Sequence, residues 1–401
     1  MTKRVAIVAG EASGDMLGAA LVRAVRSRFP DTEFYGIAGP RMIAAGARTL
    51  VPMEKLSVRG YVEAIRSLPE LLRIRSSLAS QLLRDRPDLF IGVDAPDFNL
   101  GLETRLKRAG IPTVHYVSPS IWAWRPGRLP AIGRAADRVL TIFPFEAPIY
   151  EKAGIAATYV GHPLADQIPL ASGHAEARAQ LRLGDSTTAV ALLPGSRRGE
   201  LEAHADLFID TALRLAARRP GTRFFVPLAT RETRDYFETR LYAREAQALD
   251  FTILFGHARL ALQAADAGLV ASGTATLEGA LARCPMVITY KVPPLTYRIM
   301  MRKPLLPYVG LPNILAGEFI VPELIQDHAT PENLEQALAN WLDHKIARER
   351  LAARYEAIHA ELRCGNDERV AQALSPWLSQ GPSRAPQAPA GDRELAALRS
   401  R

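Results

Sequence analysis

The sequence predicts an α/β protein in which two doubly wound parallel sheets face a central cleft. Short apolar stretches rich in β-branched residues alternate with amphipathic helical patterns, which is typical of parallel sheets covered by helices on both faces. This alternation restarts near residue 189, after a polar link at roughly 161–187 that contains Pro163 and Pro169. With 401 residues, the chain is long enough for two such domains.

The elements follow in order along the chain. In the first half we expect strands at 5–9, 34–37, 89–93, 113–117 and 139–142, with helices that include 16–27 and 68–84. The second half predicts strands at 189–193, 224–227, 252–254, 267–270 and 286–290. Residues 331–377 have a helical pattern that opens on Thr330 as the N-cap, and the Pro- and Ala-rich residues 381–401 are expected to form a disordered tail.

The composition indicates a globular chain with an anionic partner. The net charge of +8 favours nucleic acid, an anionic membrane surface or a phosphorylated substrate. Two cysteines, Cys284 and Cys364, argue against a disulfide scaffold, and the histidines lack metal-ligand spacing, so we expect neither metal nor cofactor. Neither a signal peptide nor an apolar stretch of about 20 residues is visible, which predicts a soluble, cytoplasmic chain.

The first polar turn, GEASGD at 10–15, follows the first predicted strand. Its glycines let a ligand approach the backbone, and the helix that follows attracts anions at its N-terminus. The turn has neither the dinucleotide fingerprint nor the P-loop pattern. Ser13 or Asp15 as a helix cap is the structural alternative, whereas Glu11 is not needed for capping and favours a function.

The second polar turn, GVDAPDFN at 92–99, carries two aspartates around Pro96. A carboxylate at the carboxyl end of a strand is well placed as a general base, and partial burial would raise its pKa toward the working range. We expect one aspartate to be structural, as a cap for the helix that begins near Phe98. Asp97 is the preferred base, and Glu11 and Asp94 are the next candidates.

The third polar turn, LLPGSRRGE at 192–200, offers backbone N–H groups at a helix start and two arginines that suit a diphosphate. Glu200 either caps the helix or orients an arginine. A solvated basic surface is the alternative interpretation of this turn.

The fourth polar turn, SGTATLE at 272–278, combines small residues with a carboxylate one helical turn later. Ser272, Gly273 and Thr274 would let a phosphate approach, and Glu278 would accept hydrogen bonds from a ribose diol. An ordinary capped helix, with Glu278 complementing its dipole, is the alternative. Together with the third turn, this motif predicts a nucleotide-diphosphate site in the second half.

Three further segments have two interpretations each. His162, in VGHP, either contacts a ligand or caps its turn. The loop with Trp122, Trp124, Arg125 and Arg128 suits base stacking or a lipid interface. The basic and apolar stretch 297–318 is either core or a membrane-facing loop.

Eight ordered motifs across the chain resemble those of the lipid-A-disaccharide synthase family. They are GEASGD (10–15), GVDAPDFN (92–99), YVSPSIWAWRPGR (116–128), FPFE (143–146), YVGHPL (159–164), LLPGSRRGE (192–200), SGTATLE (272–278) and LPNILAG (311–317). The resemblance implies a GT-B fold, with a Rossmann-like acceptor domain over 1–165 and a Rossmann-like UDP-sugar domain over 185–344. It also implies that helices at about 345–377 pack back on the first domain or swap into a second subunit, so a homodimer stays open.

The resemblance implies an inverting, metal-independent glycosyltransferase. It would join UDP-2,3-diacylglucosamine to 2,3-diacylglucosamine 1-phosphate (lipid X), forming a β-1,6-linked disaccharide and releasing UDP. The enzyme would act at the cytoplasmic side of the inner membrane, as a peripheral protein on an anionic surface. Asp97 would take the acceptor's proton, with Glu11 or Asp94 as alternatives, and the implied substrate-binding residues are Ser13, Gly14, His162, Ser196, Arg197, Glu200, Ser272, Gly273, Thr274, Glu278 and Asn313.

Two other functions compete with this one. A glycosyltransferase or 2-epimerase of the same fold would act on an unacylated UDP-sugar. A nucleic-acid- or membrane-binding protein would use the basic charge without catalysis, but acids at strand ends would repel phosphate backbones and no nucleic-acid motif is present. We therefore expect no nucleic-acid partner.

Overall fold

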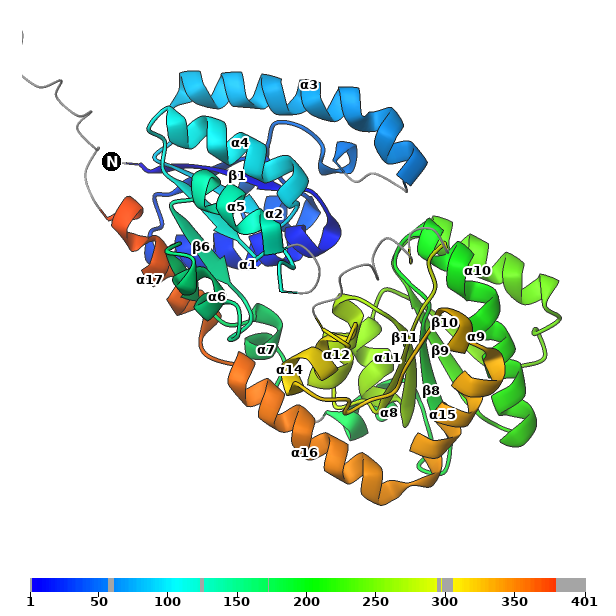
Figure 1. The fold of residues 1–401 in the computed structure, drawn as a ribbon. Coiled ribbons are helices and arrows are strands. Elements are labelled where there is room, and N and C mark those ends of the chain that lie inside the picture. Colours follow the sequence, from blue (N-terminus) through cyan, green and yellow to red (C-terminus); the bar gives the residue numbers. More distant parts are fainter. Residues whose placement is uncertain are drawn as a thin grey trace, which may run out of the picture.

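The computed structural model describes residues 2–56, 61–122, 126–171, 173–293, 297 and 306–379. Its strands form two sheets, one from each half of the chain, with helices around both (Figure 1). The predicted α/β class with two doubly wound parallel sheets is confirmed. The expected tail at 381–401, together with Trp124 and Arg125, lies outside the described residues.

The first sheet has seven strands in the order β3-β2-β1-β4-β5-β6-β7. Its strands are β1 Arg4–Ala9, β2 Glu33–Ile37, β3 Ala47–Thr49, β4 Leu89–Val93, β5 Thr113–Tyr116, β6 Arg138–Thr141 and β7 Ala157–Tyr159. Its helices are α1 Ala12–Arg28, α2 Pro40–Ala44, α3 Tyr61–Asp85, α4 Pro96–Arg108, α5 Leu129–Ala135, α6 Ala147–Lys152 and α7 Pro163–Gln167. Strand β4 is buried along its whole length, as its uninterrupted apolar run predicts.

The second sheet has six strands in the order β10-β9-β8-β11-β12-β13. Its strands are β8 Ala189–Leu193, β9 Arg223–Leu228, β10 Phe251–Phe255, β11 Ala267–Ala271, β12 Met286–Tyr290 and β13 Glu323–Ile325. The helices of this half are α8 His174–Gln180, α9 Arg198–Arg218, α10 Arg231–Ala243, α11 Ala258–Ala264, α12 Thr274–Leu281, α14 Leu311–Ala316 and α15 Pro331–Asp343. Two C-terminal helices follow, α16 Lys345–Leu362 and α17 Asn366–Leu378.

Every strand that we predicted is present, to within one or two residues at its ends. Strands β3, β7 and β13 were not predicted, and each is only three residues long. Three residues are too few to show a periodic pattern. Thr330 caps α15 as expected, since its side chain accepts a hydrogen bond from the Asn333 N–H at 3.3 Å.

The alternative interpretation of the first polar turn, in which Ser13 or Asp15 caps the first helix, is wrong. Helix α1 begins earlier than predicted, with Glu11 as its N-cap. Asp15 is only 3% exposed, and its two carboxylate oxygens accept the backbone N–H groups of Arg41 and Met42, each at 2.9 Å. Asp15 therefore caps α2, a helix that begins 25 residues later in the chain.

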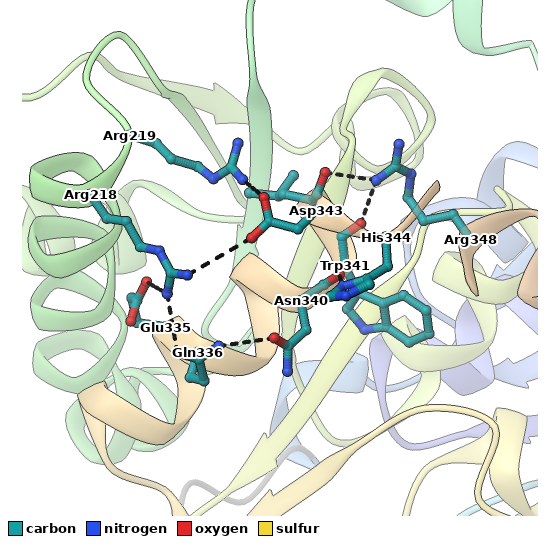
Figure 2. Close-up of polar contacts among 10 residues, drawn as sticks. Arg218, Arg219, Glu335, Gln336, Asn340, Trp341, Asp343, His344 and Arg348 are labelled. Atoms are coloured by element: carbon teal, nitrogen blue, oxygen red, sulfur yellow. Dashed lines mark hydrogen bonds and ion pairs between the residues drawn. The ribbon is translucent and has the colours of Figure 1, made fainter. Parts of the chain in front are cut away.

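Polar contacts join helix α15 to the end of α9 and to α16 (Figure 2). Arg218, near the end of α9, donates to Glu335 at 3.2 Å, and the neighbouring Arg219 pairs with Asp343. The last carbonyls of α15 also accept hydrogen bonds from Arg348, which lies on α16. A cation at a helix C-terminus satisfies such carbonyls and opposes the helix dipole favourably.

The chain crosses between the two halves twice, at adjacent points. The first crossing passes through α7, and the second joins α16 to α17. The His162 N–H donates to the Leu362 carbonyl at 3.2 Å, and the Asn366 amide donates to the Gly161 carbonyl at 3.0 Å. Helix α16 contacts α12 and α14 of the second half, whereas α17 packs on α1 of the first (Figure 1).

The described part of the chain contains neither a membrane-spanning helix nor a cluster of metal ligands. None of its helices combines the length and apolar character of a membrane span. Nor does it contain a group of three or more His, Cys, Asp and Glu side chains placed to hold a metal ion.

Replacing Asp15 by alanine removes both hydrogen bonds to the start of α2. We expect the Asp15→Ala variant to lose about 1–3 kcal/mol of unfolding free energy, the usual effect of losing a buried cap. Thermal unfolding followed by circular dichroism checks this, with Asp235→Ala as the control because Asp235 is exposed on α10. Equal melting temperatures for the two variants would contradict the capping role.

Candidate functional site

The four polar turns predicted from the sequence lie where the two sheets reverse their strand order. The reversal is between β1 and β4 in the first sheet and between β8 and β11 in the second. The 10–15 turn follows β1 and Asp94 follows β4, while the turns at 194–200 and 272–278 follow β8 and β11. Open α/β sheets bind ligands beyond the carboxyl ends of their strands at such switch points.

Glu11 and Arg197 join the two switch points directly. The Arg197 guanidinium forms a short ion pair with the Glu11 carboxylate, although the two residues are 186 positions apart. Ser13 and Gly14 lie in the first turn of α1, where Gly14 is buried and a Cβ on it would lie 3.5 Å from the Val93 carbonyl. The first and third turns therefore face each other from opposite halves of the chain.

The Asp94 turn has an unusual backbone that neighbouring groups hold in place. Asp94 and Ala95 have φ values of 51° and 44°, in the left-handed region that non-glycine residues rarely adopt. The Asn99 amide donates to the Asp94 carbonyl at 2.8 Å. Ala95 is the N-cap of α4, so the expectation that Asp94 or Asp97 caps this helix is wrong. Strained backbone of this kind is concentrated at functional sites.

Asp94 and Asp97 lie in different environments. Burial raises the pKa of Asp94, and the charge of His115, a backbone N–H and the charge of Arg197 lower that pKa by less. Asp97 lies inside α4, where its side chain is 83% exposed and forms a short ion pair with Arg128. Asp94 therefore has the two properties expected of a base, since it follows the end of a strand and is partly buried.

Glu200 orders the third turn. Its Oε2 accepts the backbone N–H groups of Ser196 at 2.7 Å and of Arg197 at 3.2 Å, while its Oε1 lies 3.4 Å from an Arg197 guanidinium nitrogen. Gly195, with a φ of 135°, leaves room for the Glu200 side chain, because a Cβ on residue 195 would lie 2.4 Å from Glu200 Cβ. Glu200 therefore both caps α9 and orients Arg197.

The fourth turn begins α12 with an exposed glycine. Gly273, with a φ of 133°, is the N-cap, and Ser272 and Thr274 flank it. Glu278 is partly buried one turn later, and burial raises its pKa, while two arginine charges lower that pKa by less. The first of these arginines is Arg41 of α2, so Glu278 also faces the other half of the chain.

Asn313 and His162 are held by neighbouring backbone groups. Asn313 is fully buried, donates to the Val321 carbonyl at 2.9 Å and accepts from the Ile320 N–H at 2.8 Å. His162 Nδ1 accepts the Leu164 N–H at 3.2 Å, which makes it the cap of α7. Burial lowers the pKa of His162 to about 3, so its ring is neutral at physiological pH. The structure does not bring these two side chains to the contact between Glu11 and Arg197.

Comparison with known proteins decides the family. A family model described as lipid-A-disaccharide synthetase matches residues 5–374. The lipid-A-disaccharide synthase of Methylobacillus flagellatus is 54% identical over 374 residues, which cover 93% of this chain and 99% of that protein. The chain belongs to the lipid-A-disaccharide synthase family.

Solved structures share the fold of this lipid-A-disaccharide synthase family member. The UDP-GlcNAc 2-epimerase from Neisseria meningitidis bound to UDP-GlcNAc has a TM-score of 0.63 and 12% identity, covering 94% of this chain and 100% of that chain. CalG4, the calicheamicin glycosyltransferase, has a TM-score of 0.55 and 13% identity, covering 94% and 99%. At these identities the likeness concerns only the GT-B fold, whereas family membership makes the chain a glycosyltransferase.

Four polar residues near the switch point between β1 and β4 were not predicted as site residues from the sequence. Glu103 and His115 form a buried pair, and Asn99 and Arg41 contact or face residues of the predicted turns. The one available signal was a histidine inside an otherwise apolar strand, in the sequence TVHY. Such a histidine more often belongs to an ordinary core, so the sequence alone did not distinguish it.

A buried carboxylate anchors the aromatic loop of this synthase family member. Glu146 is only 1% exposed, and it accepts the Trp122 indole N–H at 2.9 Å and the Phe143 N–H at 3.1 Å. Burial raises the pKa of Glu146 to about 7, and these hydrogen bonds lower it by less. Glu146 therefore joins Trp122 to Phe143, which follows β6.

The raised pKa of Glu146 predicts a pH-dependent stability. Because the folded protein binds this proton more tightly than the unfolded chain, the stabilisation is complete below about pH 4.5 and is lost as the pH rises through about 7. In Glu146→Gln, which cannot ionise, we expect this loss of about 1–3 kcal/mol to be absent. Urea denaturation between pH 5 and 8 measures it.

The control for this prediction is Glu151→Gln, because Glu151 is exposed on α6. This control should keep the pH dependence of the unmodified protein. Parallel stability curves for Glu146→Gln and the unmodified protein would contradict the role of Glu146.

Proposed function

We propose that the chain joins UDP-2,3-diacylglucosamine to 2,3-diacylglucosamine 1-phosphate, forming a β-1,6-linked disaccharide 1-phosphate and releasing UDP. Family membership supports this reaction, and UDP-sugars as donors are consistent with the ligand of the epimerase of the same fold. The observation that carries the proposal is the meeting of Glu11 and Arg197 beside Asp94 at two opposed switch points. The first sheet would bind the acceptor, and the second would bind the UDP-sugar.

In this mechanism Asp94 is the general base. Its carboxylate takes the proton from the acceptor 6-hydroxyl while that oxygen attacks the anomeric carbon from the face opposite UDP. The new C1–O6 bond forms as the bond from C1 to the phosphate oxygen breaks, and UDP leaves with the electron pair. Partial burial suits this role, since it raises the pKa of Asp94 toward that of an effective base.

Arg197 would stabilise the negative charge that develops on the departing UDP. Its guanidinium is already oriented by Glu200 and lies opposite Glu11, so little reorganisation is needed during the reaction. The α12 N-terminus, with Ser272, Gly273 and Thr274, would bind the diphosphate, and Glu278 would bind the ribose hydroxyls.

The apolar and basic surface of α3 supports a peripheral association with an anionic membrane. Leu68 and Leu72 are 52% and 44% exposed, and Arg73 and Arg75 follow on the same helix. This association would place the site at the cytoplasmic side of the inner membrane, where its lipid substrates reside. We expect the purified protein to sediment with vesicles that contain anionic phosphatidylglycerol, and the double variant Leu68→Ser/Leu72→Ser to sediment less. Equal sedimentation would contradict a role for α3.

Mass spectrometry of the reaction products tests the function itself. The purified protein is incubated, with detergent and a chelator, with UDP-2,3-diacylglucosamine and lipid X, and in parallel with UDP-N-acetylglucosamine. We expect disaccharide 1-phosphate from the acylated pair alone. Turnover of only the soluble UDP-sugar would reject the lipid substrates and favour an epimerase or another glycosyltransferase.

Asp94 and Asp97 make a matched pair for testing the base. We expect Asp94→Asn to lower kcat by about 10²–10⁴-fold, the usual contribution of a positioned base, and Asp97→Asn to lower it by less than about tenfold. Steady-state kinetics of disaccharide formation measure both variants. The reverse order of effects would move the role to Asp97, as the sequence alone favoured.

A further inference from the structure

Behind Asp94 lies a buried charged pair that the proposed mechanism does not use. His115 Nδ1, on β5, lies 2.7 Å from Glu103 Oε1, on α4, and neither side chain has any exposed surface. The remaining polar atoms of the pair, His115 Nε2 and Glu103 Oε2, have no hydrogen-bond partner within the described residues. Burying such a pair costs several kcal/mol of desolvation, so hydrophobic residues would serve stability equally well.

The backbone leaves space for this pair next to the strained turn. Gly92 lies opposite His115 in the β4–β5 register, and a Cβ on it would lie 2.1 Å from Glu103 Oε1. A glycine inside a buried strand often marks a close approach of this kind. Asn99, one helical turn before Glu103, holds the Asp94 carbonyl, so α4 presents both residues to the end of β4.

From Glu103 through His115 to Asp94, the charges alternate in sign when His115 is protonated. Burial lowers the pKa of His115, but the charge of Glu103 and its hydrogen bond outweigh burial and, with the charge of Asp94, raise that pKa above its usual value. The groups that face Asp94 are His115 and, from the second half, Arg197. A cationic His115 favours the ionised form of Asp94, which burial alone would disfavour.

We propose that Glu103 and His115 are positioning residues for the reaction, whose charges act from the neighbouring strand to keep Asp94 ionised. The inference rests on the proposed function only in naming Asp94 as the base. His115 exchanges no proton during turnover: the proton from the acceptor hydroxyl stays on Asp94 until product leaves and then passes to water. Glu103 keeps His115 charged, and His115 in turn keeps Asp94 ready for the next acceptor.

The pH profile of kcat tests this role with Glu103→Gln. Without Glu103, His115 becomes neutral and Asp94 harder to ionise, so we expect the acidic limb to move upward by at least about half a pH unit. The rate at alkaline pH and the KM values should change little. The control is Asp137→Asn, because Asp137 also binds β5, through the Thr113 N–H at 2.8 Å, but at the opposite end of the strand.

A double variant separates a joint role from two independent ones. Glu103→Gln and His115→Gln should each move the acidic limb upward, and the combined variant should move it no further than the larger single shift. Additive shifts would overturn the proposal. An equal loss of kcat at every pH, or a rise in KM alone, would also overturn it, since either result indicates a merely structural role.

Imidazole nitrogen NMR of the free, full-length protein tests the charge of His115 without any assay. The His115 signal, assigned by its absence in His115→Gln, should show the imidazolium form above pH 6.5 in the unmodified protein but not in Glu103→Gln. A neutral His115 at pH 6 in the unmodified protein would overturn the proposal, even if Glu103→Gln failed to fold. Absence of disaccharide from the unmodified protein would instead overturn the proposed function, while the NMR result would still decide on the pair.

Discussion

The reversal of strand order next to the first strand of each sheet is the constraint on which the rest of the structure depends. At β1 and β4, and again at β8 and β11, the connections leave in opposite directions and expose the carboxyl ends of the two central strands. The sequence uses these four ends for carboxylates, arginine and small residues. Because both sheets present this edge to each other, Glu11 meets Arg197 although they belong to different halves.

The buried acids of the first half differ in how their charges are compensated. Asp15 and Glu146 are almost fully buried, and each accepts backbone or indole N–H groups that offset its desolvation. Asp94 is different, because its carboxylate lies at a strained turn between the charges of His115 and Arg197. Buried acids that are fully hydrogen-bonded fix local structure, whereas a half-buried acid between charged groups is suited to gaining and losing a proton.

The sequence predicted those parts of the fold that depend on local patterns. Buried strands such as β4 and β8 are continuous apolar runs, and the polar turns after them were visible as motifs. Contacts between distant segments were not predictable, so the cap that Asp15 gives to α2 was missed. Burial also distinguishes Asp94 from Asp97, and the spacing of two aspartates around a proline contains no information about burial. Glu103 and His115 were missed for the same reason, because the packing of α4 against β5 that brings them together is a property of the whole fold.

The paired crossings near α7 and before α17 limit how the two halves can move. A single connecting segment would permit rotation about any axis, but two segments joined by hydrogen bonds at His162, Gly161 and Asn366 act together as one hinge. Because Glu11 and Arg197 belong to different halves of the chain, any turn of the halves about this hinge would change the distance between the two charges.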